Sequence, residues 1–125
     1  MTYDEFNSYC RSLRSSTYVC QWGGAHVWKV GGKVFAVGGW ENNAGVSVSF
    51  KVSDADFVFM QSEAGFRGAP YMATRGMKWI QIYDLSLIEN SEVESYLHNS
   101  YCLILKGLTK KKRRVLGLLV DVGNS

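Results

Sequence analysis

Two adjacent glycines between two apolar runs constrain the fold of this chain more than any other feature. Residues 27–30 and 33–37 are rich in valine and aromatic side chains, and only Gly31 and Gly32 separate them. Such a two-residue connection predicts a β-hairpin, because the turns that match strand twist need positive φ at both central positions. The predicted cross-strand pairs are Trp28 with Phe35, Lys29 with Val34, and Val30 with Lys33.

Alternation of side chains predicts two further strands. In residues 46–52 valine and phenylalanine alternate with serine and lysine, which indicates an antiparallel strand with one buried face. On this pattern Ser47 and Ser49 belong to a solvated face. Residues 77–83 show a similar alternation, and the segment 66–76 before them predicts a loop with at most a short extended piece, because it holds the only proline.

Three helices are predicted from caps and apolar stripes. The first covers residues 2–14, where Thr2 and Glu5 form a capping box. The second begins after Ser53 and is expected to stop at Gly65. The third begins with a second capping box, Ser91 with Glu94, and its apolar stripe continues to residue 108. The order helix, three or four strands, helix, strand, helix predicts an α+β fold, with an antiparallel sheet and helices packed on one face.

Charge divides the chain into a nearly neutral body and a basic tail. With 125 residues the chain is long enough for one domain, which we place at residues 1–109. Five of the 14 basic residues stand at 110–114, so the other nine are balanced by the ten acids before residue 110. The tail, 110–125, is basic and then apolar, and like-charge repulsion should fray any helix that enters it. We find no signal peptide and no apolar run long enough to cross a membrane, so a cytoplasmic location without membrane contact is expected.

Residues suited to catalysis or metal binding are few. The common nucleotide-binding, hydrolase and zinc-protease motifs do not occur. The candidates for acid–base or nucleophilic chemistry are His26, His98 and Cys20, which lie far apart in the sequence. We expect Cys10 and Cys102 to be structural, since each lies on an apolar helical stripe. Paired acids occur only in predicted first turns of helices, where the helix dipole explains them, so we expect no metal, no cofactor and no enzymatic activity.

Basic residues near the predicted turns suggest contacts with nucleic acid. Hairpins that carry lysine beside a glycine turn can touch phosphates, and aromatic side chains near them can stack on bases or pack in the core. The aromatic candidates are Trp22, Trp28 and Trp40. The candidate phosphate contacts are Lys29, Lys33, Lys51, Arg75 and Lys78. The alternative for each lysine is a solvated charge that guards a sheet edge.

Four segments, taken in order, resemble the MmcQ/YjbR family. They are WKVGGKVFAV at 28–37, VSVSFKV at 46–52, GAPYMATRGMKWIQI at 68–82 and ESYLHNSYCLILKGL at 94–108. The resemblance covers about residues 1–112 and implies a compact α+β fold similar to the frataxin/CyaY arrangement. It also implies a largely uncharacterised bacterial family whose fold has been described as a double wing and proposed to bind DNA. The acidic first helix with which frataxins bind iron is missing here, because Arg11 and Arg14 follow Asp4 and Glu5.

Three functional hypotheses follow from these observations. The first is a non-enzymatic domain that binds DNA through its phosphates, with little sequence specificity, because no residue set here reads bases. The second is a protein-interaction or small-ligand module that uses an aromatic surface of Trp22, Trp40 and Tyr71. The third is an unrecognised enzyme, which requires a pocket that holds His26, His98 or Cys20 beside a polar partner.

Overall fold

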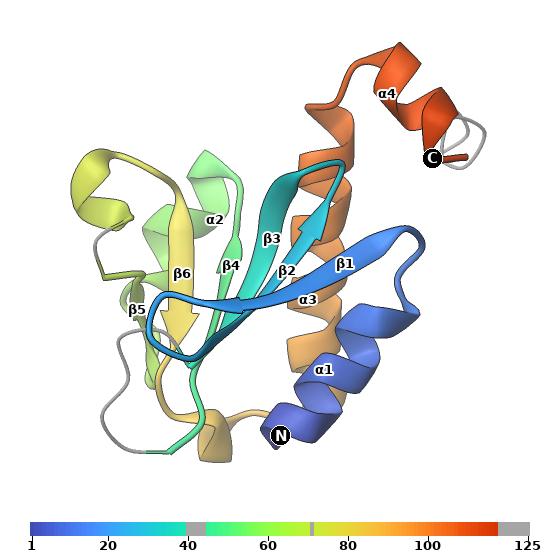
Figure 1. Ribbon diagram of the computed structural model, residues 1–125. Coiled ribbons are helices and arrows are strands. Elements are labelled where there is room, and N and C mark those ends of the chain that lie inside the picture. Colours follow the sequence, from blue (N-terminus) through green and yellow to red (C-terminus); the bar gives the residue numbers. More distant parts are fainter. Residues whose placement is uncertain (40–44, 71, 118–125) are drawn as a thin grey trace.

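One antiparallel sheet organises the molecule. The computed structural model describes residues 1–39, 45–70 and 72–117 (Figure 1). Within these residues six strands form the sheet in the order β1-β2-β3-β4-β6-β5. The elements are α1 (Tyr3–Ser12), β1 (Ser16–Gln21), β2 (Ala25–Val30), β3 (Lys33–Gly38), β4 (Val48–Lys51), α2 (Asp54–Met60), β5 (Phe66–Gly68), the 3-10 turn η1 (Ala73–Arg75), β6 (Trp79–Ile82), the 3-10 turn η2 (Leu85–Leu87), α3 (Asn90–Lys106) and α4 (Lys110–Val115). The predicted α+β class is confirmed.

The predicted Gly-Gly hairpin joins β2 to β3. Gly31 and Gly32 have φ angles of 60° and 81°, as a turn with positive φ at both positions requires. The pairs Lys29 with Val34 and Val30 with Lys33 are confirmed. The pair Trp28 with Phe35 is wrong, because the register shifts after Trp28 and brings Ala36 opposite it. This β-bulge makes Phe35 the extra residue, and it lets Phe35 and Ala36 both reach the main core.

The predicted helix starts are correct for α1 and α2 and wrong for α3. At Thr2 both hydrogen bonds of the capping box are present, and the Ser53 hydroxyl accepts from Asp56 N–H at the start of α2. However, α2 ends at Met60, well before Gly65. The second capping box does not form, because α3 already begins at Asn90 and Ser91 therefore lies inside its first turn.

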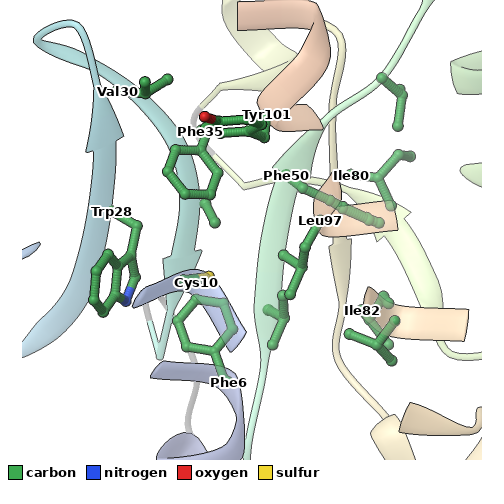
Figure 2. Packing of buried hydrophobic residues seen from close by; sticks show 14 of the residues in the cluster. Phe6, Cys10, Trp28, Val30, Phe35, Phe50, Ile80, Ile82, Leu97 and Tyr101 are labelled. Atoms are coloured by element: carbon green, nitrogen blue, oxygen red, sulfur yellow. The ribbon is translucent and has the colours of Figure 1, made fainter. Parts of the chain in front are cut away.

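The helices cover one face of the sheet and enclose the main core. Figure 1 shows α3 running behind the sheet, and Figure 2 shows how side chains of α1 and α3 meet those of the strands. Phe6 of α1, Phe35 of β3, Phe50 of β4 and Leu97 of α3 are all completely buried there. Phe57 and Met60 of α2 pack against the same cluster, so all three helices lie on one face, as predicted.

The opposite face of the sheet has a second, smaller core. Its members are Ala25, Val27, Val37, Ala69, Met72 and Trp79, and the segment between β5 and η1 supplies two of them. The expected solvated face of β4 is therefore wrong: Ser47 and Ser49 are both buried. Ser49 lies in the sheet between Val37 and Gln81, which are completely buried themselves.

The basic run forms a helix of its own. Thr109 caps α4 by accepting a hydrogen bond from Lys112 N–H at 3.1 Å. After α4, Leu116 packs against the main core, and its carbonyl accepts a hydrogen bond from the Ser15 hydroxyl at 3.0 Å. The expected fraying is thus wrong for residues 110–115, because a new cap restarts the helix after the end of α3. The apolar part of the predicted tail lies outside the described residues from position 118 on.

Candidate nucleic-acid interface

The end of the sheet at the β2–β3 turn, called the hairpin end below, brings together ends of the four interior strands, and β1 starts there too, because Ser16 pairs with Val30. The antiparallel pairing of β3 with β4 brings the last residues of β4 beside the first residues of β3. Lys51 pairs with Trp79, so β6 starts where β4 ends, and Val52 N–H donates to the Lys78 carbonyl at 2.9 Å just beyond that pair. The hairpin end therefore spans β2, β3, β4 and β6.

All five predicted phosphate contacts lie at the hairpin end. Lys29 and Lys33 flank the turn, Lys51 is the last residue of β4, and Lys78 immediately precedes β6. Arg75 ends η1, three residues before Lys78. Lys33 and Arg75 are exposed, and the other three are half-buried. The topology thus brings together residues that are up to 49 positions apart in the sequence.

These cations surround the hairpin end instead of lining one flat face. Trp28 and Val30 point into the main core, so the alternation of the strand directs Lys29 to the face opposite the helices. Lys78 takes the helix side, where its ammonium group lies 5.1 Å from the centre of the Phe57 ring. This contact places the positive charge over the ring face, which attracts cations.

Further cations reach the same end through α3. Leu108, just after α3, packs so closely on the turn that a Cβ atom added to Gly31 would lie 2.7 Å from Leu108 Cδ1. Lys106 and the cations of α4 therefore extend the basic region at the hairpin end (Figure 1). From the sequence, residues 110–114 are expected to form a separate tail. The direction of α3 across the sheet instead brings them to the same end as the other lysines.

The acids are distributed unevenly in the described chain. Both α1 and α3 start at the end of the sheet opposite the hairpin end. The acids in their first turns and at the cap of α3 therefore lie at that opposite end. They include Asp4, Glu5, Glu89 and Glu92. The pKa of Glu5 is lowered because the Thr2 backbone N–H donates to its carboxylate, so this group stays ionised. Near the hairpin end α2 supplies Asp54 and Asp56 in its first turn.

A buried serine fixes α3 to the strands at the hairpin end. The Ser100 hydroxyl donates to the Phe35 carbonyl at 2.7 Å and accepts from Lys51 N–H at 2.9 Å. These two groups belong to β3 and β4, at positions where one strand begins and the other ends. Ser100 thus replaces missing ladder hydrogen bonds and sets the backbone position of Lys51. No pattern in the sequence indicates this role.

The aromatic candidates separate into core and surface residues. Trp28 is buried, and its Nε1–H donates to Asn7 Oδ1 at 2.8 Å, so it cannot stack on a base. Trp22 lies at the β1–β2 turn and is 44% exposed. Trp40 and Tyr71, the other two members of the predicted aromatic surface, lie outside the described residues.

The candidate catalytic residues form one pair and one separate site. Cys20 and His26 are cross-strand partners in β1 and β2, and the Tyr18 hydroxyl lies 2.8 Å from His26 Nδ1. His98 lies on α3, where both of its ring nitrogens are 3.9 Å from Cys102 Sγ. A groove of about 420 Å³ runs between α2 and α3, and none of His26, His98 or Cys20 lines it.

The cysteines at positions 10 and 102 are shielded from solvent to different degrees. Cys10 is completely buried in the main core, and this burial raises the pKa of its thiol. Cys102 is half-buried, and its pKa is raised for the same reason. Across residues 1–39, 45–70 and 72–117, no three histidine, cysteine, aspartate or glutamate side chains come together as metal ligands would.

The sheet and the helices on its face define a small α+β domain. The model of the YjbR family matches residues 11–103, and the chain belongs to this family. The crystal structure of Deinococcus radiodurans protein DR2400, which has a DUF419 domain, superimposes with a TM-score of 0.80. The two chains share 22% identity, and the match covers 94% of this chain and 88% of the other. Among curated proteins none matches the sequence.

No helix in the described part of the chain is both long and apolar enough to cross a membrane.

Proposed function

We propose that this YjbR-family protein is a non-enzymatic domain that binds DNA through the phosphates, with the hairpin end as its contact surface. One observation carries the proposal: cations from three strands, from η1 and from the residue before β6 gather at one end of the sheet. Lys29, Lys33, Lys51, Arg75 and Lys78 are the contacts we expect, with α4 adding attraction that does not depend on base sequence.

Protection of sheet edges does not explain these lysines. Charged side chains commonly guard an exposed edge strand against pairing with another chain. In this sheet the edges are β1 and β5, whereas Lys29, Lys33 and Lys51 belong to the interior strands β2, β3 and β4. Their charges therefore need another explanation, and contact with a polyanion supplies one.

The width of the hairpin end fits a DNA duplex. Neighbouring strands lie about 4.8 Å apart, so β2 and β6, three spacings apart, are separated by roughly 14 Å. The major groove of B-DNA is about 12 Å wide. Lysines at both sides of the hairpin end can therefore reach phosphates of both strands. Nothing at this end presents the paired donors and acceptors that read base edges, so we expect weak sequence preference.

Fluorescence anisotropy of a labelled duplex across a salt series tests the proposal. With about five phosphate contacts, the logarithm of the association constant should fall with the logarithm of salt concentration with a slope of about −4 to −5. Lys33→Glu and Lys78→Glu should each weaken binding and reduce the slope by about one. The full chain is used throughout, because Leu116 packs on the core.

A matched control separates local contacts from net charge. Ser91→Glu combined with Ser95→Glu changes the net charge by the same amount as one lysine reversal, but on exposed positions near the start of α3. If this double variant weakens binding as much as Lys33→Glu does, the hairpin end is not the contact surface. Loss of all binding in Lys110→Gln/Lys111→Gln/Lys112→Gln alone, with the strand variants unchanged, would assign the binding to α4 and contradict the proposal.

A protein-interaction role is the second candidate, and exposed apolar residues favour it. Val58 and Phe59 on α2 are 62% and 73% exposed, and Trp22 adds an exposed ring at another place. Exposed aromatic and aliphatic residues are typical of contact surfaces between proteins. No binding of duplex DNA at low salt by the wild-type chain would leave this candidate as the better one.

A further inference from the structure

The two edges of the sheet differ in how they are protected. The edge strand β5 has three residues, carries Arg67 at its centre and is followed within two residues by Pro70. Short length, charge and proline are the features by which proteins prevent edge strands from pairing with another chain. The edge strand β1 has none of them. It is six residues long, its sequence STYVCQ holds no charge and no proline, and its pairing with β2 is regular throughout.

The exposed side chains of β1 are also suited to a protein contact. Thr17, Tyr18 and Cys20 are exposed, and Val19 is half-buried against the smaller core. An unpaired strand edge presents a row of N–H and C=O groups that another strand can satisfy. Among the described residues, β2 is the only strand that pairs with β1. The second edge of β1 is therefore a template for one more strand.

We propose that β1 pairs with β1 of a second copy of this chain, in an antiparallel arrangement that joins the two sheets. The absence of charge on β1 favours a second copy as the partner, and the position of Arg14 before β1 favours the antiparallel direction. An uncharged strand brings no like charges opposite each other when it meets its own copy. Arg14, which precedes β1 by two residues, stands at one end of the strand only, so antiparallel pairing keeps the two copies of this residue apart, whereas parallel pairing would bring them together. Arg11 is held over the ring of Trp28 in the neighbouring strand β2.

The symmetry of such a pair restricts its register. A two-fold axis perpendicular to the joined sheet keeps the helices of both copies on one side, so opposing residues must belong to the same face of β1. The register centred on Val19 meets this condition and pairs nearly the whole strand. It places Val19 opposite its own copy, Tyr18 opposite Cys20, and Thr17 opposite Gln21. Val19 points to the face of the smaller core, so the two valines extend that apolar row.

Sedimentation analysis over a concentration series is the first test. One strand pairing buries less surface than a permanent dimer interface, so the mass should rise from 14.0 kDa toward twice that value only as concentration rises toward the millimolar range. Val19→Lys places two ammonium groups opposite each other and should abolish the rise, with circular dichroism as the check on folding. Ser95→Lys, the same charge on an exposed helical site, should leave the rise unchanged.

Cross-linking tests the register without adding charge. In the Cys20→Ser background, Val19→Cys should form an intermolecular disulfide under mild oxidation, because opposing residues in antiparallel strands bring Cα atoms within disulfide reach. The matched variant Ser95→Cys in the same background should not. A chain that stays at 14.0 kDa at all concentrations overturns the proposal. Hydrogen exchange of the monomer then shows the state of the outer edge of β1. Protected β1 amides indicate that another part of the same chain pairs with this edge, and fast exchange indicates that the edge is open to solvent.

Discussion

Ser100 provides the sharpest test of how this fold is held together, because one hydroxyl serves two strands. The side chain is completely buried, and Ser100→Ala removes both its hydrogen bonds at once. The Phe35 carbonyl and the Lys51 N–H are then left in the interior without a partner. Each such buried group costs about 1–3 kcal/mol, so the free energy of unfolding should fall by about 2–6 kcal/mol. For a domain whose total stability is of the order of 5–15 kcal/mol, this loss is severe.

Ser47 supplies the matched control for that substitution. It is also a buried serine of this sheet region, but its Oγ has no hydrogen-bond partner among the described residues. Ser47→Ala therefore removes an unsatisfied polar atom, and the free energy of unfolding should stay the same or rise slightly. Urea denaturation followed by tryptophan fluorescence measures both variants, with the difference taken from the midpoint and the slope. Equal effects of the two substitutions, or a loss below about 0.5 kcal/mol for Ser100→Ala, would refute the reasoning.

Three further outcomes are expected. Gly38→Ala should destabilise the fold by about 1–3 kcal/mol in thermal or urea denaturation, because the added Cβ would lie 2.7 Å from the buried ring of Phe6; wild-type stability would show that the ring can move aside. Thiol labelling should modify the exposed Cys20 first, Cys102 more slowly, and the buried Cys10 only on unfolding. Burial raises the pKa of Cys10, so the folded chain keeps the thiol proton at pH values where the unfolded chain loses it. The free energy of unfolding should therefore be unaffected by this thiol below the pKa of the unfolded group, about 8.5, and should fall by up to about 1.4 kcal/mol per pH unit above it. Cys10→Ala should remove this part of the alkaline loss, measured as the difference between the two pH profiles.

Features that depend on neighbouring residues could be predicted from the sequence. The capping box of Thr2 and Glu5 and the positive-φ turn of Gly31 and Gly32 need only a few residues to be specified, and both are present. The predicted strand register failed where a contact with residues distant in the sequence determines the local structure. Phe35 leaves the expected register because a bulge lets it reach the core beneath α3, and hairpin chemistry alone cannot show that.

The candidate interface shows the same limit. Lysines near predicted turns could be selected from the sequence, and all five prove to lie at one end of the sheet. Their meeting depends on strand order, which places β6 beside β4 although β5 precedes it in the chain. Likewise, alternation assigned Ser49 to solvent, but a period of two does not show that Ala69 and Met72 contribute to a second core on that face.

Helix dipoles explain only part of the uneven charge of this molecule. They account for acids such as Glu5 in a first turn and for cations such as Lys106 in a last turn. Lys33, by contrast, is not part of a helix: it is the first residue of β3, beside the turn on which the end of α3 packs. The chain thus places its strand lysines on interior strands and leaves the edge strand β1 uncharged, the reverse of what protection against association requires. Contact of the hairpin end with a polyanion would account for the lysines on the interior strands, and pairing of β1 with a second copy would account for the uncharged edge. The lysine reversals and Val19→Lys test these two contacts independently.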